Sequence, residues 1–349
     1  MLDINNAVSM AQQMNASDIH IVSDRPVKCR IDGQITTLDE RIIPAQECEE
    51  IIRELAGESY RLVEKIGELD MALTFECGAR TRINIFRSNG AVSAAIRILS
   101  DHIPEIEALE LPEAVGMFPK YSNGIVLVTG ETGSGKSTTL AAVLNRINHT
   151  RAEHIITLED PVEYIYTPDK CVINQREIGR DTRSYADGLR AILREDPDII
   201  LIGEMRDLDT IEAALTAAET GHLVFATLHT NSAADSIDRI VGVFPDGRQK
   251  QIRMQLSTTL RVVLSQQLVP KTSGGRVAAC EVMVVNDAIR NIIREGKTPQ
   301  IENFIAMNQQ GGSILMDNAL MKLAAEGKIS REEAAKRSKN MAETTNFSC

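Results

Sequence analysis

The sequence predicts an α/β protein in which a small mixed module precedes a larger domain built on a parallel sheet. In the first hundred residues, apolar and polar positions alternate as they do in half-buried strands. A glycine-rich loop motif follows the apolar segment 125–129, and beyond it short apolar strands alternate with segments of helical periodicity. The length of 349 residues is sufficient for two domains of ordinary size, each with its own core.

The first module is predicted over residues 1–100. A helix is expected over 3–14, followed by a hairpin that turns at the dipeptide Asp32-Gly33. A long amphipathic helix begins at Pro44 and is expected to break at Gly57. A meander of three antiparallel strands then follows, with apolar alternation at 71–75, 83–85 and 91–99.

The segment 101–112 contains two prolines and several charges, and we predict it to be the linker between the domains. The second domain is expected over 113–349. Its predicted strands lie at 125–129, 154–158, 198–203, 222–228 and 277–285. Helical periodicity at 207–219 and 232–241 favours a parallel sheet covered on both faces. From about residue 286 we predict a helical C-terminal appendage, with helices at 286–295, 315–326 and 330–340.

Composition and charge exclude several classes of protein. No aliphatic run approaches the roughly 20 residues that a membrane-spanning helix needs. The first residues lack the basic and apolar regions of a secretory signal, so we expect a cytoplasmic protein. A net charge of −11 and an aromatic content of 3% disfavour nucleic acid as a partner. The six cysteines include no CxxC pair, so neither a zinc site nor a disulfide framework is expected.

Residues 130–137, GETGSGKS, satisfy the GxxxxGK(S/T) pattern of a phosphate-binding loop. The glycines allow successive backbone N–H groups to close around phosphate oxygens, and the helix that begins near Lys136 adds its positive end. Lys136 is expected to reach the β- and γ-phosphates of a nucleotide, and Ser137 to ligate Mg²⁺. A chance match is the alternative, which the strand before the motif disfavours. We therefore predict nucleotide binding by Gly130, Thr132, Gly133, Ser134, Gly135, Lys136, Ser137 and Thr138.

Two further predicted strands end in acidic residues. A nucleotide site of this kind needs a second strand that ends in an acid beside the metal ion and the attacking water, and Glu204 follows the apolar run 199–202. A glutamate that caps the next helix is the alternative. The predicted strand before it ends in Glu159, Asp160 and Glu163. We expect Glu163 to orient or deprotonate water and Glu159 or Asp160 to lie near Mg²⁺, with a solvated acidic turn as the alternative.

Histidines and arginines supply the remaining candidates. His222 and His229 bracket the strand 223–228, where either hydrogen bonding to the γ-phosphate or a structural role fits a histidine. Arg82 and Arg97 lie on predicted strands of the first module. A guanidinium group there can stabilise the charge of phosphoryl transfer, whereas a solvated surface role is the alternative.

Four motifs in order carry a resemblance to a known family. GETGSGKST at 130–138, ITLEDPVEY at 156–164, IILIGEMRD at 199–207 and TGHLVFATLHT at 220–230 resemble the Walker A, Asp box, Walker B and His box of the type II secretion and type IV pilus ATPase superfamily. ASDIHI at 16–21 and RIDGQI at 30–35 resemble the PAS-like first domain of that superfamily. AIRNIIRE at 288–295 is similar to a C-terminal element of its pilus retraction members, and the likeness covers nearly the whole chain.

The resemblance implies an N-terminal PAS-like α/β domain, a RecA-like P-loop domain and a homo-hexameric motor that uses ATP and Mg²⁺. It implies Walker B chemistry for Glu204, a catalytic base at Glu163, first-domain arginines Arg82 and Arg97 that reach the nucleotide, and His-box roles for His222 and His229. It also implies an inner-membrane pilus platform protein and the extension ATPase of the same machine as partners. The expected location is the cytoplasm, peripherally at the inner face of the cytoplasmic membrane.

Alternatives remain for whether the motor retracts or extends a pilus, and for whether the chain is a pilus motor at all. Extension ATPases usually have a further N-terminal domain and a tetracysteine insertion, whereas here the first module starts at residue 1 and no CxxC is present, which favours pilus retraction and twitching motility. A retraction paralogue or an extension-type ATPase is the alternative. A RecA-like DNA translocase is disfavoured by the acidic composition. A non-catalytic regulator would lack an acid, yet both Glu163 and Glu204 are present.

Overall fold

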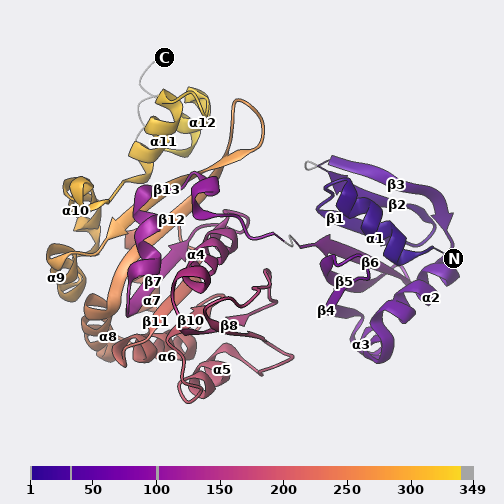
Figure 1. The fold of residues 1–349 in the computed structure, drawn as a ribbon, viewed down its shortest axis with the longest axis horizontal. Coiled ribbons are helices and arrows are strands. Elements are labelled where there is room, and N and C mark those ends of the chain that lie inside the picture. The colour runs from indigo at the N-terminus through magenta and orange to yellow at the C-terminus, as the bar shows by residue number, and fades with distance from the viewer. Residues whose placement is uncertain (1, 32–33, 100–101, 339–349) are drawn as a thin grey trace. The chain divides into compact units, whose positions relative to one another are not determined.

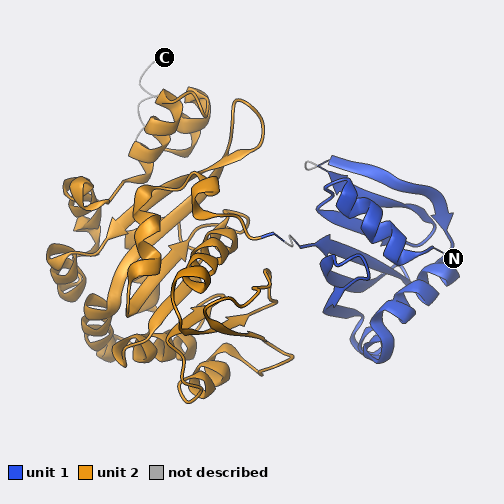
Figure 2. Ribbon diagram, in the orientation of Figure 1, with its two compact units in different colours: residues 1–102 blue, residues 103–349 orange. Residues whose placement is uncertain are grey.

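The computed structural model describes residues 2–31, 34–99 and 102–338 and divides the chain into two compact units. Unit 1 comprises residues 1–102 and unit 2 comprises residues 103–349 (Figure 2). Each unit combines helices with one sheet, which confirms the predicted α/β class. Within the part of the chain that the structure describes, no helix is both long enough and apolar enough to cross a membrane.

Unit 1 is built on an antiparallel six-stranded sheet in the order β3-β2-β1-β6-β5-β4 (Figure 1). Its strands are β1 (Asp18–Val22), β2 (Arg25–Ile31), β3 (Gln34–Ile43), β4 (Glu68–Thr74), β5 (Arg80–Ser88) and β6 (Ala91–Ile98), and its helices are α1 (Ile4–Gln13), α2 (Ala45–Ala56) and α3 (Tyr60–Ile66). Alternate strand residues such as Ile19, Ile83 and Ile96 pack with the helices in one core. The predicted first helix, the strand meander and the helix break at Gly57 are confirmed, while the dipeptide Asp32-Gly33 lies outside the described residues.

The other face of this sheet carries a row of charged side chains. Asp18 lies opposite Arg30 on one side and Arg97 on the other, and Arg97 in turn lies opposite Arg82. Residues that are directly opposite on neighbouring strands share a face, so these side chains form one line across four strands. Asp18 accepts a hydrogen bond from Arg97 Nε at 2.9 Å. The two arginines that the sequence singles out are therefore neighbours on the face away from the helices.

Unit 2 contains a seven-stranded sheet in the order β13-β12-β7-β11-β10-β8-β9. Its strands are β7 (Gly124–Thr129), β8 (His154–Glu159), β9 (Val172–Glu177), β10 (Ile199–Ile202), β11 (Leu223–Leu228), β12 (Leu260–Pro270) and β13 (Arg276–Val284). Its helices are α4 (Lys136–Thr150), α5 (Tyr185–Ile192), α6 (Leu208–Glu219), α7 (Ala233–Gly242), α8 (Asp246–Thr259), α9 (Asp287–Glu295), α10 (Ile301–Met307), α11 (Met316–Ala325) and α12 (Arg331–Arg337). All neighbouring strands are parallel except β12 and β13.

The strands of unit 2 alternate between two cores, one on each face of the sheet. Ile125 and Leu127 of β7 pack into a core with helices α5 to α10, whereas Val126 and Val128 pack against α4. A third, smaller core joins the outer ends of β12 and β13 to α11 and α12. The predicted sheet with helices on both faces and the helical appendage are therefore confirmed.

Three parts of this domain differ from the prediction. The predicted strand at 277–285 runs antiparallel, because it pairs with β12, a strand that the sequence reading left out. No turn residue separates β12 from α8, which ends at Thr259, so the pattern gives no boundary there. β9 was also not predicted, because this edge strand is mostly polar, and α10 adds a short helix to the appendage.

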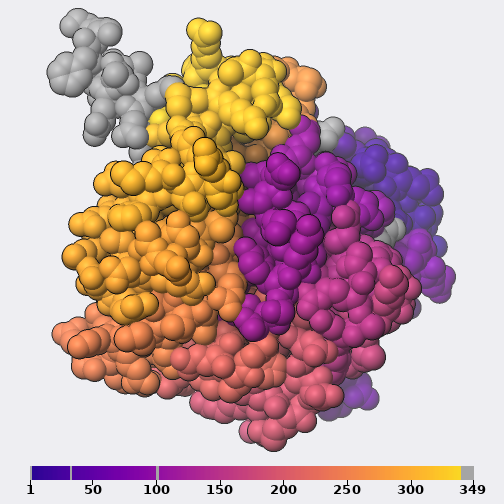
Figure 3. Space-filling view, turned by 60° about the vertical axis from the view of Figure 1, so that its left-hand side comes forward, coloured from indigo at the N-terminus to yellow at the C-terminus, as the bar shows by residue number. Residues whose placement is uncertain are grey.

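The predicted linker 101–112 is wrong over most of its length. From Ile103 onward the chain packs on unit 2, with Ile106 buried beneath α4. Arg146 of α4 pairs with Glu105 and Glu107 at 3.1 and 2.5 Å. Figure 3 shows the first segment of unit 2, in magenta, against the C-terminal segments in orange and yellow.

Glu110 anchors the end of this segment. Its carboxylate pairs with Lys271, which follows β12, at 2.5 Å and with Lys328, between α11 and α12, at 2.8 Å. Hydrogen bonds from these two lysines lower the pKa of Glu110 to about 2. A stretch that looks like a polar linker in the sequence is thus a fixed part of unit 2.

Helix α9 has a structural role that its sequence only partly indicates. Ile289, Ile292 and Ile293 are buried, as its periodicity predicts. Arg290 Nη1 donates to the carbonyl oxygens of Ser257 and Thr258, at 2.7 and 3.0 Å, in the last turn of α8. These carbonyls have no partners within their own helix, so the guanidinium group caps α8.

We expect Arg290→Ala to lower the free energy of unfolding by about 1–3 kcal/mol, because it removes charged hydrogen bonds from partly buried carbonyls. Arg294→Ala is the matched control, since this exposed arginine lies one turn further along the same helix. Urea unfolding measures both. Equal midpoints for the two variants would contradict the capping role.

Candidate functional site

Four parallel strands end at one edge of the unit 2 sheet, and each is followed by a predicted site residue. β7 pairs with β11, β11 with β10, and β10 with β8, all in parallel. Their carboxyl ends therefore meet at the same edge, where ligands of parallel sheets gather. Gly130 follows β7, Glu204 lies two residues after β10, and His229 follows β11, while Glu159 is the last residue of β8.

The loop after β7 is held in its conformation by glycine and by Lys136. Gly130 has φ of +139°, and a Cβ there would lie 2.3 Å from the carbonyl oxygen of Gln266, so the position accepts only glycine. Gly133 and Gly135 also have positive φ. Lys136 Nζ donates to the carbonyls of Gly130 and Glu131 at 2.8 and 2.9 Å. The loop thus curls around the lysine ammonium group.

The loop fits the phosphates of a nucleotide. The hydroxyl of Ser134 is buried and has no hydrogen-bond partner among the described residues, so a donor is held inside the loop for a bound acceptor. Lys136 begins the 15-residue helix α4, whose first backbone N–H groups point toward the same space. Burial lowers the pKa of Lys136, whereas the nearby charges of Glu204 and Glu163 oppose that shift. Both acids therefore act on the lysine.

Glu204 lies at the centre of the charged groups. Its carboxylate contacts Arg206 at 2.6 Å and His229 Nε2 at 3.3 Å. Burial raises the pKa of Glu204, but the hydrogen bonds and charges of Arg206 and His229 outweigh it and lower the pKa overall. Glu204 is therefore an ionised carboxylate, able to bind a metal-bound water or orient the attacking water.

The acids after β8 have different environments. Glu159 is buried, and its carboxylate accepts hydrogen bonds from Thr157 at 2.7 Å, Gln175 at 3.3 Å and the backbone N–H of Glu163 at 3.3 Å. Burial raises the pKa of Glu159. Glu159 accepts a hydrogen bond from the backbone N–H of Glu163 and thereby helps to hold the segment that carries it, while its predicted place near Mg²⁺ stays a prediction. Glu163 and Asp160 are exposed at the same edge.

The segment that carries Glu163 is fastened to α4 and β9. Thr138 and Tyr164 share a hydrogen bond of 2.9 Å between their hydroxyls. Asn148, which is fully buried, donates to the carbonyl of Thr167 at 2.9 Å and accepts from Asp169 N–H at 3.0 Å. Thr138, predicted to bind nucleotide, therefore also fixes the acid-bearing segment to the phosphate loop.

His222 lies at the opposite end of β11 from this edge, and its contacts fit the structural alternative; its predicted His-box role stays a prediction. It precedes β11, whereas His229 follows it, and the six residues of the strand separate them by about 20 Å. His222 Nδ1 lies 2.9 Å from the carbonyl of Ala217 and 3.1 Å from the hydroxyl of Thr220, so it ties the end of α6 to the start of β11.

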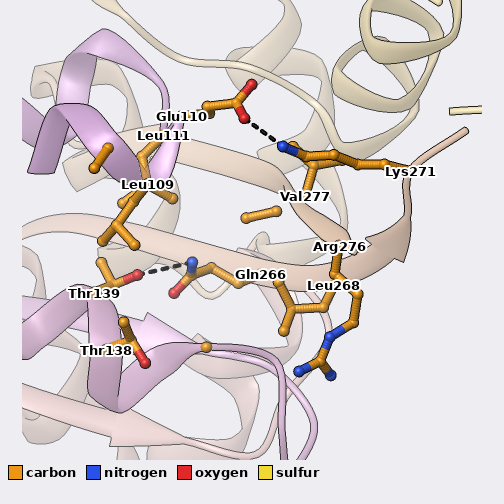
Figure 4. A pocket seen from close by; sticks show the side chains of 13 residues that line it. Leu109, Glu110, Leu111, Thr138, Thr139, Gln266, Leu268, Lys271, Arg276 and Val277 are labelled. Carbon is orange, nitrogen blue, oxygen red and sulfur yellow. Dashed lines mark hydrogen bonds and ion pairs between the residues drawn. The ribbon is translucent and has the colours of Figure 1, made fainter. Parts of the chain in front are cut away.

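A cavity of about 190 Å³ opens beside the phosphate loop (Figure 4). The residues that line it come from the segment before β7, the start of α4 and the β12–β13 hairpin: Ala108, Leu109, Glu110, Leu111, Gly135, Thr138, Thr139, Gln266, Leu268, Lys271, Arg276, Val277 and Ala278. Gln266 donates to the hydroxyl of Thr139 at 3.0 Å, while its carbonyl oxygen is buried without a partner among the described residues. The lining combines the apolar side chains of Leu109, Leu268 and Val277 with polar and charged ones, and such a mixed cavity suits a flat, polar-edged ring such as a nucleotide base.

Arg82 and Arg97 belong to unit 1. Arg97 Nε lies 2.9 Å from Asp18 and Arg82 Nε lies 3.8 Å from Asp70. Arg97 is exposed, whereas Arg82 is half-buried. They form a pair of guanidinium groups on one surface. Their predicted contact with a nucleotide remains a prediction at this point.

Sequence reasoning missed several residues that build the site. Arg206 lies two residues after Glu204, and this spacing in the sequence could have indicated that it contacts the predicted acid. Tyr185 has its hydroxyl 3.0 Å from where a Cβ of Gly203 would lie, and burial together with Asp160, Glu204 and Glu159 raises its pKa. Gln266 and Asn148 come from segments without a motif, and only the fold brings them to the site.

Comparisons with known proteins agree with this geometry. The model of the family described as type II/IV secretion system protein matches residues 1–336. The chain is 44% identical to the type IV pilus retraction ATPase PilT of Pseudomonas aeruginosa, over 97% of this chain and 98% of that protein. It is 42% identical to the twitching motility protein of Neisseria gonorrhoeae, over 89% and 84% of the two chains. A crystal structure of the pilus retraction motor PilT with bound ADP superposes with a TM-score of 0.92 at 44% identity, covering 99% of this chain and 100% of that one.

The geometry separates binding from turnover. We expect Lys136→Ala to weaken MgATP binding by roughly 10- to 100-fold, because it removes a charged donor to the phosphates. Glu204→Gln is expected to keep binding within a few-fold and to lower kcat by about 100-fold or more, because the neutral amide cannot act as an anionic partner of metal-bound water.

Titration with a fluorescent nucleotide and a phosphate-release assay measure the two effects. Lys250→Ala, an exposed lysine on α8, is the control and should match the unmodified chain. The same loss of nucleotide affinity in the Lys136 and Glu204 variants would contradict this division of roles.

Proposed function

The chain belongs to the type II/IV secretion system protein family, and from that premise we propose that it is a motor ATPase that hydrolyses MgATP to drive the retraction of type IV pili. The observation that carries the proposal is the convergence of the phosphate loop, Glu163 and Glu204 on one sheet edge. In addition, this chain is similar to a retraction ATPase along nearly its whole length.

Bound ATP would be held by two parts of unit 2. The backbone N–H groups of residues 130–135, the Ser134 hydroxyl and Lys136 would bind the phosphates, and the cavity lined by Leu109, Leu268 and Gln266 would take the adenine base. The unsatisfied carbonyl oxygen of Gln266 can accept a hydrogen bond from an exocyclic amino group. Such a contact favours adenine over guanine, which presents a carbonyl at the equivalent position.

The chemistry would use residues on both sides of the γ-phosphate. Ser137 and, through water, Glu204 would hold Mg²⁺, which when bound neutralises the phosphate charge. Glu163, fixed by its backbone N–H to Glu159, would take the proton of the attacking water. His229 would report the state of the γ-phosphate to Glu204 through their 3.3 Å contact. Asp160 would remain close enough to order water around the metal.

We further infer a homo-hexamer in which Arg82 and Arg97 of unit 1 complete the site by stabilising the transferred charge. This inference is supported by the position of the two guanidinium groups on directly opposite residues of neighbouring strands, since a positioned fork binds phosphoryl oxygens better than a loose one. A ring at the inner face of the cytoplasmic membrane would act on the pilus platform protein. There it would work in opposition to the extension ATPase of the same machine.

The arginine role predicts a selective kinetic defect. We expect Arg82→Ala and Arg97→Ala each to lower kcat for MgATP by about 10-fold or more while KM changes little, because these groups act on charge that develops in the transition state. Arg87→Ala, which removes an exposed arginine from the other face of β5, should leave kcat unchanged. Unchanged kcat in both test variants would return them to a surface role.

The retraction role predicts a phenotype in cells. A strain that lacks this chain should assemble pili in normal or greater number but fail to withdraw them, as seen by imaging labelled pili. The unmodified chain should restore withdrawal, and Lys136→Ala should not. Loss of pilus assembly in the deletion strain would indicate an extension ATPase, and normal withdrawal would indicate a paralogue with another role.

A further inference from the structure

Glu281 is a buried carboxylate beside the site that none of the nucleotide motifs includes. It lies on β13 with only 4% of its surface exposed. Its Oε1 accepts a hydrogen bond of 2.8 Å from the backbone N–H of Ala233, the first residue of α7. A buried carboxylate is costly unless it is well partnered, so its position at the positive end of a ten-residue helix compensates part of that cost.

The start of α7 is fixed by a group of short hydrogen bonds around this contact. Ser232 caps the helix by accepting from Asp235 N–H at 3.1 Å. The hydroxyl of Ser236 donates to the carbonyl of Ser232 at 2.7 Å and lies 2.7 Å from the hydroxyl of Thr230. Three residues, 230–232, separate Ala233 from His229. The turn that carries His229 is therefore fixed at its far end by Glu281.

Glu281 also belongs to a row of directly paired residues that reaches β7, the strand before the phosphate loop. It faces Ser265 across the β12–β13 pair. The Thr129 hydroxyl donates to the Ser265 hydroxyl at 2.9 Å, and Thr129 is the last residue of β7. One row of polar residues across three strands thus joins the phosphate loop to the helix that follows His229.

We propose that Glu281 is a positioning residue for ATP hydrolysis, which holds the β11–α7 turn so that His229 keeps its contact with Glu204. This inference rests on the proposed ATPase activity. The contact of 3.3 Å between His229 Nε2 and Glu204 is made by an exposed histidine on a short turn, so a small shift of that turn breaks it. Because the hydrogen bond of Glu281 is made to Ala233 at the start of α7, its effect on the reaction passes through the turn.

A double-mutant cycle with His229 tests the proposal. Glu281→Ala is expected to lower kcat for MgATP by about 10-fold with KM within about 2-fold, because a misplaced turn affects the reacting geometry more than ground-state binding. Glu281→Gln keeps an oxygen acceptor for Ala233 N–H and should recover most of the lost rate. His229→Ala and the double variant Glu281→Ala/His229→Ala should have the same kcat, since the second change removes what the first one positions.

Asn286→Ala is the matched control, because Asn286 caps the start of α9 by accepting from Ile289 N–H at 3.0 Å, away from His229. Its effect on kcat should be negligible, with or without His229→Ala. If Glu281→Ala does not fold, the cycle is run with Glu281→Asp, which withdraws the carboxylate by about 1.5 Å.

Additive losses of rate in the cycle, or a raised KM with unchanged kcat, would overturn the positioning role while leaving the ATPase assignment intact. Absence of hydrolysis by the unmodified chain would instead remove the proposed function itself. The two failures are thereby distinguishable in one assay.

Discussion

The parallel pairing of β7, β11, β10 and β8 is the constraint on which the site depends. The central residues of these strands are buried and largely apolar, so each strand must lie within the sheet, and a parallel arrangement brings all their carboxyl ends to one edge. The order of the strands places the phosphate loop beside the His229 turn and Glu204 between that turn and the acids after β8. Site residues from four segments that are far apart in the sequence are thereby brought together.

Electrostatic balance then decides what this edge can do. Burial alone lowers the pKa of Lys136 and raises that of Glu204, which moves both toward the neutral form. Arg206 and His229 lower the pKa of Glu204 by more than burial raises it. The carboxylates near Lys136 offset part of the decrease that burial causes in the pKa of the lysine. The pKa of Glu204 stays low next to the phosphate loop because its contacts with Arg206 and His229 stabilise the ionised carboxylate. Glu159, more deeply buried and with a raised pKa, is instead held by neutral donors and serves the geometry.

The sequence predicts the parts of this fold that local pattern determines. Continuous apolar runs identify β7, β8, β10 and β11, and the glycine spacing identifies the phosphate loop. The sequence pattern does not predict β9, which is a polar edge strand, or β12, which follows α8 directly. Neither strand has an apolar run bounded by turn residues. The sequence leaves a site role and a structural role open for His222, because proximity to a strand does not tell which end of that strand carries the ligand. The segment after Ile103 looked like a linker because its salt partners Arg146, Lys271 and Lys328 are distant in sequence. Gln266 and Glu281 are recognisable only when the antiparallel pair β12–β13 is known.

We infer that unit 2 binds MgATP at the carboxyl edge of its sheet. An experimental structure of the full chain with Mg²⁺ and a non-hydrolysable ATP analogue tests this most directly. We expect the β- and γ-phosphates within residues 130–137, the metal ion on the Ser137 hydroxyl, and the adenine base in the cavity beside Gln266 and Leu268. Phosphates bound outside this loop, or a base that leaves that cavity open, would contradict it.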